Sequence, residues 1–302
     1  MSAAIAAAPK SARRPGRLRP LAGIALRQYW IAGAILLLLA LCIGVQIVYH
    51  YQGWADAIAL RDHVGSEAYH FGRYTDDAHT MTARLMDDGT MLAFQPALLA
   101  ALLTGVLTAR EWESRRVVLA LTQTVTPRRW FGVRWAVLAA ILVVLTVPLV
   151  ALYRMSVVHA FHLDLLTYGA ERQNAYYTIG PVTVAYVVLG VAAGALTGTL
   201  LRRLWPTLLA APLLTWLVAA LLVRSRAMLL LDLPVLAKVD GYHPGAVFGL
   251  MFYDALPQDA YLTNALDTGD YWPFQIASST LVLAVAALFV LASFRVIRRR
   301  TA

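Results

Sequence analysis

Six runs of about 20 apolar residues constrain this chain more than any other feature. A helix needs about 20 predominantly apolar residues to cross the hydrocarbon core of a bilayer. The chain is also 60% hydrophobic and only 14% charged, whereas about a quarter of the residues in a soluble domain are charged. We therefore predict an all-α integral membrane protein with six transmembrane helices. The runs are Tyr29–Val48, Met91–Thr108, Phe131–Tyr153, Gly180–Leu201, Thr207–Val223 and Pro273–Phe294.

Lysine and arginine are distributed unevenly between the connecting segments, and this asymmetry predicts the orientation. If the N-terminus is cytoplasmic, the cytoplasmic parts hold 18 of the 26 basic residues and 2 of the 17 acidic residues. Both termini of this multi-pass membrane protein are therefore predicted to be cytoplasmic. The basic excess also favours attraction to anionic membrane lipid. It does not indicate nucleic-acid binding, because no nucleic-acid motif accompanies it.

This topology divides the chain into a transmembrane domain and two tails. Residues 1–28 are expected to form a cytoplasmic tail and a basic amphipathic interfacial segment, which could equally be a positive anchor for the first helix. Residues 29–294 form the six-helix transmembrane domain, and residues 295–302 form a basic cytoplasmic tail. The connecting segments are three outer loops, 49–90, 154–179 and 224–272, and an inner loop, 109–130.

Small residues recur every four positions in the second and fourth runs, so in each helix they lie on one face. Such faces let another helix approach closely, and we expect them to be buried in protein rather than in lipid. Packing within the chain is favoured over a subunit interface, but both interpretations stay open. The residues are Ala97, Ala101 and Gly105 in the second run, and Gly190, Gly194 and Gly198 in the fourth.

Motifs for chemistry inside the chain are missing. There is no G-x-x-x-x-G-K-[ST] phosphate loop, no G-x-S-x-G elbow and no H-E-x-x-H. The centres of the apolar runs carry no charged residue, which argues against a proton-coupled transporter and an intramembrane enzyme. A single cysteine, Cys42, excludes an internal disulfide and is interpreted as core filler. His159 and His162 could supply half of a zinc site, but surface histidines are the favoured interpretation because no third ligand is evident.

The inner loop 109–130 combines charged residues with an apolar patch. Glu111 and Arg115 are four apart in the acid-first order that favours a helix, and Pro127 ends any such helix near Thr126. The sequence "VVLAL" supplies the apolar patch. A short helix with this mixed surface suits docking to a soluble partner. A charged loop that merely obeys the positive-inside rule is the alternative.

The same loop resembles that of ATP-binding-cassette type-2 permeases, especially the actinobacterial ones. Their pattern is similar to A-R-E-x-E-x-G-T-x-R-L-x-W-x-Q-S-V-T-R-x-R-W and aligns without a gap. "LRQYW" and "PVTVAYVVLGVAAGALTGTLLRRLWP" also resemble this family. Arg115 and Arg116 depart from it, because they stand where the family usually has Gly-Thr. The matching positions are Ala109, Arg110, Glu111, Glu113, Leu119, Gln123, Val125, Thr126, Arg129 and Trp130.

The resemblance implies the permease subunit of an ATP-driven exporter in the bacterial plasma (inner) membrane. Its inner loop would contain a short coupling helix between transmembrane helices two and three, seated on a separate cytoplasmic ABC ATPase. That partner would bind ATP-Mg, whereas this chain would bind no cofactor or metal and would not be an enzyme. Substrate would leave through a pore between two permease chains, in a homodimer or heterodimer. The residues implied at the ATPase interface are Glu111, Trp112, Glu113, Arg115, Arg116, Arg202 and Arg203.

A different class of function stays open beside transport. The chain could be a polytopic membrane enzyme, or a scaffold, with its active or binding site in the outer loops. An ATPase that co-purifies with the chain would favour transport. Metal-dependent activity without any ATPase would favour the enzyme.

Overall fold

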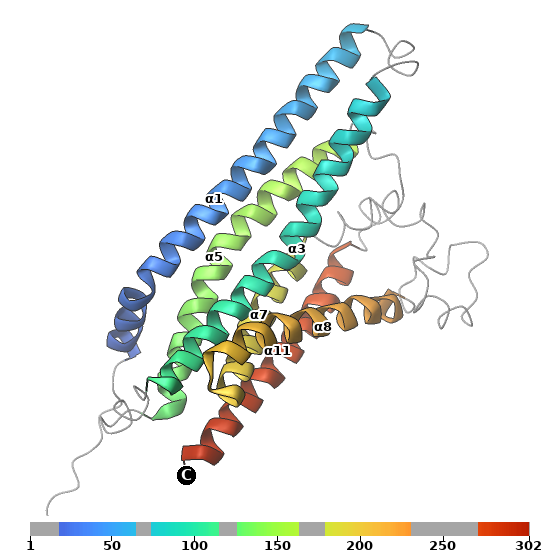
Figure 1. Ribbon diagram of the computed structural model, residues 1–302. Coiled ribbons are helices and arrows are strands. Elements are labelled where there is room, and N and C mark those ends of the chain that lie inside the picture. The colour runs from blue at the N-terminus through green and yellow to red at the C-terminus, as the bar shows by residue number, and fades with distance from the viewer. Residues whose placement is uncertain (1–17, 65–73, 115–125, 163–178, 231–270, 302) are drawn as a thin grey trace, which may run out of the picture.

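Six long helices make up the part of the chain that the computed structural model describes, which is residues 18–64, 74–114, 126–162, 179–230 and 271–301 (Figure 1). All six are long and apolar enough to cross a membrane, and each coincides with one of the predicted runs. The prediction of an all-helical chain with six spans is confirmed. The helices are α1 (Leu18–Val64), α3 (Tyr74–Glu113), α5 (Pro127–His162), α7 (Pro181–Leu201), α8 (Leu204–Leu230) and α11 (Tyr271–Thr301).

The first three helices are much longer than the apolar runs within them. Helix α1 has 47 residues and is therefore about 70 Å long at 1.5 Å per residue, whereas the hydrocarbon core is about 30 Å thick. The sequence "ADAIALRDHV" that follows its apolar run contains good helix formers, so nothing ends the helix at the membrane surface. As a result, α1 and α3 both continue into the predicted outer loop 49–90. The basic segment before the first run belongs to the same helix from Leu18 onward.

Helix α7 is the centre of the bundle and α1 lies at its edge (Figure 1). In its most apolar 18-residue window, 72% of the α7 residues are buried, against 11% for α1. Helix α7 contacts α3, α5, α8 and α11, whereas α1 packs on α5 and α3. Cys42, on α1, is exposed. The prediction that this cysteine fills the core is wrong, because its helix is peripheral.

The two faces of small residues pack against each other, joining α3 to α7. A Cβ atom added to any of the three α7 glycines would lie only 2.1–2.7 Å from a backbone carbonyl oxygen of α3. No side chain larger than hydrogen therefore fits between these two helices, and the face of α7 is occupied within the chain. The pairs are Gly190 with Ala97, Gly194 with Ala101, and Gly198 with Gly105.

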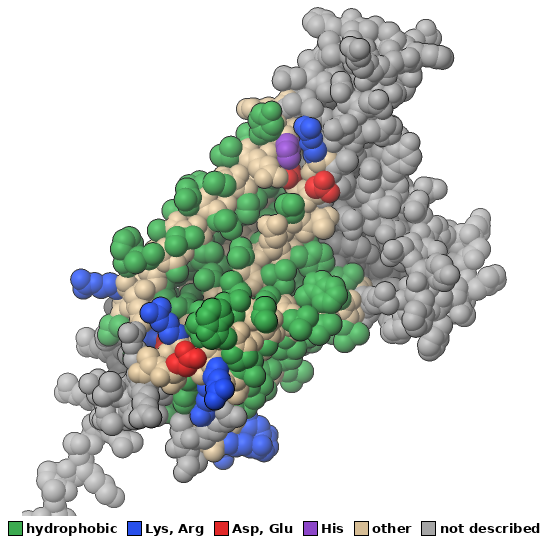
Figure 2. All heavy atoms as spheres, viewed as in Figure 1, with side chains coloured by type: hydrophobic (Ala, Val, Ile, Leu, Met, Phe, Trp, Pro, Cys, Tyr) green, Lys and Arg blue, Asp and Glu red, His purple; other side chains and the backbone are tan. Residues whose placement is uncertain are grey.

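Apolar side chains cover the visible flank of the bundle, and charged ones gather toward its two ends (Figure 2). On α1 alone, Trp30, Leu38 and Val45 are each more than 60% exposed, as expected for a surface against lipid. We call one end the basic end. There α1 begins, α3 ends, α5 begins, α7 joins α8 and α11 finishes (Figure 1).

The opposite end holds a buried carboxylate that is satisfied by α1. Asp88 of α3 is 5% exposed. Its Oδ1 accepts a hydrogen bond of 2.7 Å from Gln46 Nε2, and its Oδ2 lies 2.6 Å from His50 Nδ1. A buried charge requires such partners, so this contact joins α1 to α3.

Candidate functional site

The basic end brings together residues that flank segment 115–125. Helix α3 ends at Glu113 just before this segment, and α5 begins at Pro127 just after it. Arg115, Arg116 and the middle of the predicted coupling loop 109–130 lie within the segment and therefore outside the described residues. The first residues of that loop belong to α3 and its last residues to α5. The side chains on either side of the segment come from α1, α3, α5 and the α7–α8 turn. We call them the basic-end cluster, which comprises Gln28, Glu111, Trp112, Glu113, Trp130, Arg134 and Arg202.

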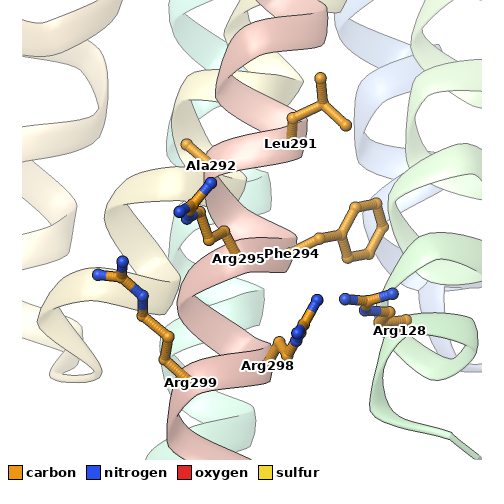
Figure 3. A pocket seen from close by; sticks show the side chains of 7 residues that line it. All are labelled: Arg128, Leu291, Ala292, Phe294, Arg295, Arg298 and Arg299. Carbon is orange, nitrogen blue, oxygen red and sulfur yellow. The ribbon is translucent and has the colours of Figure 1, made fainter.

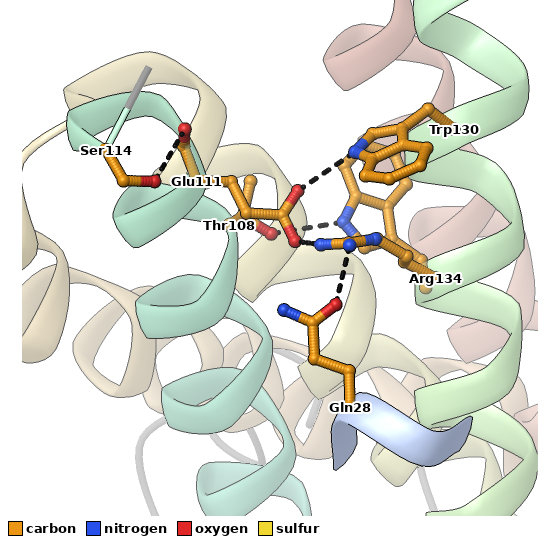
Figure 4. Close-up of polar contacts among 7 residues, drawn as sticks. Gln28, Thr108, Glu111, Ser114, Trp130 and Arg134 are labelled. Carbon is orange, nitrogen blue, oxygen red and sulfur yellow. Dashed lines mark hydrogen bonds and ion pairs between the residues drawn. The ribbon is translucent and has the colours of Figure 1, made fainter. Parts of the chain in front are cut away.

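The centre of the basic-end cluster is an ion pair between Glu111 and Arg134, whose side chains are each only 8% exposed (Figure 4). Trp130 Nε1 donates to Glu111 Oε2 at 3.3 Å, and Arg134 Nη2 donates to Gln28 Oε1 at 2.7 Å. The Arg134 guanidinium also lies 4.2 Å from the centre of the Trp130 ring, within reach of a cation–π interaction. These contacts fix the end of α3 to the first turns of α5 and to α1.

The same end of α3 contacts the turn between α7 and α8. Glu113 Oε1 accepts a hydrogen bond of 2.7 Å from the backbone N–H of Leu204, the first residue of α8, where unpaired N–H groups favour an acid. The Arg202 guanidinium lies 4.2 Å from the centre of the Trp112 ring. Arg202 ends α7 in the left-handed conformation, with φ at 54°.

A chain of aromatic rings extends this contact inward to α11. Trp112 stacks on Phe131 with ring centres 5.6 Å apart, Phe131 lies 5.7 Å from Trp135, and Trp135 lies 5.3 Å from Phe294. Trp135 Nε1 also donates to Thr108 Oγ1 at 3.1 Å. Four rings from three helices therefore form one packed unit at the basic end.

The residues predicted to meet a partner divide into three groups. Glu111, Trp112, Glu113 and Arg202 are engaged within the chain, so their side chains hold helices together. Arg203 is exposed at the α7–α8 turn. Arg115 and Arg116 lie outside the described residues. The carboxylate of Glu111 is turned toward Arg134 of α5, and its contact with a partner stays a prediction.

The sequence analysis did not identify Arg134, which organises the cluster. A signal was available, because Arg134 is a lone charge at the start of an otherwise apolar run. A charge in that position requires a buried partner, and the preceding loop offers only two acids, Glu111 and Glu113.

The described side chains contain no group of three His, Cys, Asp or Glu residues that could hold a metal ion. Both histidines of the proposed half-site, His159 and His162, lie in the last turns of α5, with side chains outside the described set. At the basic end, buried charge and aromatic packing connect the ends of six helices.

Comparison with known proteins identifies the family. No curated protein and no solved structure matches the chain. The family model described as "ABC-2 membrane transporter related" matches residues 29–227, which is more than half of the 302 residues. The match includes the second to fifth spans, most of the first, segment 115–125 and all of the basic-end cluster except Gln28. The chain therefore belongs to the ABC-2 membrane transporter related family.

Proposed function

We propose that this chain is the membrane-spanning permease subunit of an ABC exporter. A separate cytoplasmic ATPase, carrying ATP-Mg, would drive it, and two permease chains would enclose the path of the substrate. Family membership supports the transport class. The observation that carries the coupling role is that the residues on both sides of segment 115–125 belong to the basic-end cluster.

The basic-end cluster gives that segment a rigid connection to the spans. The Glu111–Arg134 pair joins its two ends across α3 and α5. Contacts from Glu113 to α8, and from Trp112 to Arg202, extend the connection to the central helix α7. Buried polar contacts and packed rings deform little. A displacement of segment 115–125 by a partner would therefore move several helices together.

The distribution of charge supports a cytoplasmic location for the basic end. Exposed arginines at this end include Arg110, Arg128 and Arg203, and an excess of arginine and lysine is typical of cytoplasmic segments. Segment 115–125 would then face the compartment that contains ATP. Arg115 and Arg116 are the residues of that segment that we propose to contact the ATPase.

Co-purification with candidate ATPases tests this function. The chain carries an affinity tag and is expressed with each ABC ATPase that is encoded beside it. The wild-type chain should retain one of these ATPases, and the double variant R115E/R116E should retain about tenfold less, because like charges then oppose each other at the interface. The matched control is Arg84→Glu, an exposed arginine near the opposite end, which should retain as much as the wild type.

Two results would contradict the proposal. One is equal retention by R115E/R116E and the wild type, provided that both elute as a single symmetric peak in size-exclusion chromatography. The other is the absence of any retained ATPase together with metal-dependent turnover by the purified chain, which would favour an enzyme with its site in the outer loops.

A further inference from the structure

A cavity of about 750 Å³ opens between α11 and the start of α5 at the basic end (Figure 3). It is separate from the basic-end cluster and is lined by seven residues, of which four are arginines and three are apolar. All four arginines are exposed. The lining residues are Arg128, Leu291, Ala292, Phe294, Arg295, Arg298 and Arg299.

The lining of the cavity changes from apolar to basic along α11. Leu291 and Ala292 lie one turn before Arg295, and Arg298 and Arg299 lie one turn after it. Residues at this spacing share one face of a helix. The face therefore carries alkyl groups toward the middle of α11 and guanidinium groups toward its C-terminal end, as Figure 3 shows.

This change falls at the depth of the lipid phosphates. The membrane-spanning part of α11 covers Gln275–Arg299, and it is preceded by the exposed Trp272, a residue type that favours the membrane interface. From Gln275, 20 residues at 1.5 Å each reach Arg295 after about 30 Å, the thickness of the hydrocarbon core. Arg295, Arg298 and Arg299 therefore lie where the opposite layer of phosphates begins.

The charges in the cavity lack a counter-ion in the described part of the chain. The guanidinium groups of Arg128 and Arg298 point toward each other across the cavity (Figure 3), and the cavity lining contains no acidic residue. Like charges that face each other are repulsive. A phosphate between them would remove the repulsion and accept bidentate hydrogen bonds from both.

We propose that this cavity binds one anionic phospholipid, with its phosphate between Arg128 and the α11 arginines. Its acyl chain follows Leu291, Ala292 and Phe294 into the membrane. Basic pockets between transmembrane helices on the cytoplasmic side are suited to anionic headgroups. The apolar wall favours a lipid over a soluble protein, because that wall lies within the membrane-spanning part of α11. This proposal does not depend on an ATPase partner.

Native mass spectrometry of the purified chain in detergent tests the proposal. The probes are phosphatidylglycerol and phosphatidylcholine with the same acyl chains. The wild-type chain should bind the first phosphatidylglycerol about tenfold more tightly than phosphatidylcholine. The double variant R295Q/R298Q should lose this preference, and R295K/R298K should keep part of it, because lysine preserves the charge without the bidentate geometry.

Two controls make the result specific to this cavity. R27Q/R110Q removes two exposed arginines at the same end of the bundle but outside the cavity, and should bind phosphatidylglycerol as the wild type does. Inorganic phosphate at the same concentration should not displace the lipid, because it lacks the acyl chain.

Three outcomes would overturn the lipid site. The first is equal binding of the two lipids by the wild-type chain. The second is full displacement of phosphatidylglycerol by inorganic phosphate, which would indicate a site for a free anion. The third is an unchanged lipid preference in R295Q/R298Q. If that variant also loses ATPase retention, these arginines would be assigned to protein docking.

Discussion

Arg134 is the residue that most clearly needs its surroundings, because it is a charge buried at the start of a membrane-spanning run. The folded chain can keep this charge buried only because Arg134 pairs with Glu111, whose carboxylate is equally buried. Taking two charges out of water is costly, and their attraction offsets that cost only while both partners are present. The main effect of the pair is therefore to fix the relative orientation of α3, α5 and α1. It is not a source of net stability.

This view predicts a specific pattern of thermal stability. Arg134→Met should lower the free energy of unfolding by about 3–5 kcal/mol, because it leaves the Glu111 carboxylate buried without its cation. The double variant E111Q/R134M should recover much of that loss, because neither charge remains. The measurement is the midpoint of thermal unfolding of the detergent-purified protein, which is monitored by fluorescence-detected size-exclusion chromatography.

Arg110→Met is the matched control for this pattern, since Arg110 is adjacent to Glu111 and exposed. It should unfold at the wild-type temperature. If the single and double variants at Arg134 were equally destabilised, the arginine would act through its packing and its bond to Gln28, and not through the ion pair.

Among the helices, the contact between α3 and α7 fixes the position of the central helix, because the glycines of α7 pack directly against the backbone of α3. Gly194→Ala should disrupt it, since the added Cβ would lie 2.3 Å from the carbonyl oxygen of Ala101. Forcing the two helices apart should cost about 1–3 kcal/mol, even though alanine favours a helix by about 1 kcal/mol relative to glycine. The thermal midpoint and the monodisperse fraction should both fall.

Gly33→Ala tests whether the effect comes from the contact or from the helix. A Cβ at Gly33 of α1 has nothing within 4 Å, so this variant should match or slightly exceed the stability of the wild type. Equal loss in both variants would contradict close packing at Gly194.

The helices also show which features the sequence could predict and which it could not. Apolar runs predict the six spans because lipid demands them, and a spacing of four predicts a face of small residues. Neither shows which helix the face meets, since any close neighbour would serve. Cys42 was misplaced because side chains facing lipid and side chains facing the core are equally apolar. The direction of Glu111 depends on the rotation of α3 against α5, which the loop sequence does not encode locally.

For the whole molecule, the unequal distribution of charge between the two ends of the bundle determines the expected orientation in the membrane. The described arginines are concentrated at the basic end, while Asp87 and Asp88 lie near the opposite one. The proposed coupling role follows from the basic end facing the cytoplasm, whereas the depth of the lipid site follows from the length of α11. An inverted chain would present segment 115–125 to the outside, where no ATPase could bind it.

Cysteine labelling in intact cells decides the orientation. Cys42 is the only cysteine, and C42A supplies a background in which a single new cysteine reports its own position. Arg84 and Ser114 are both exposed and belong to opposite ends of α3. A membrane-impermeant maleimide should label R84C in intact cells, whereas S114C should react only after the membrane is permeabilised. The reverse pattern would place the basic end outside, and it would exclude a cytoplasmic partner at segment 115–125 without affecting the packing of the six helices.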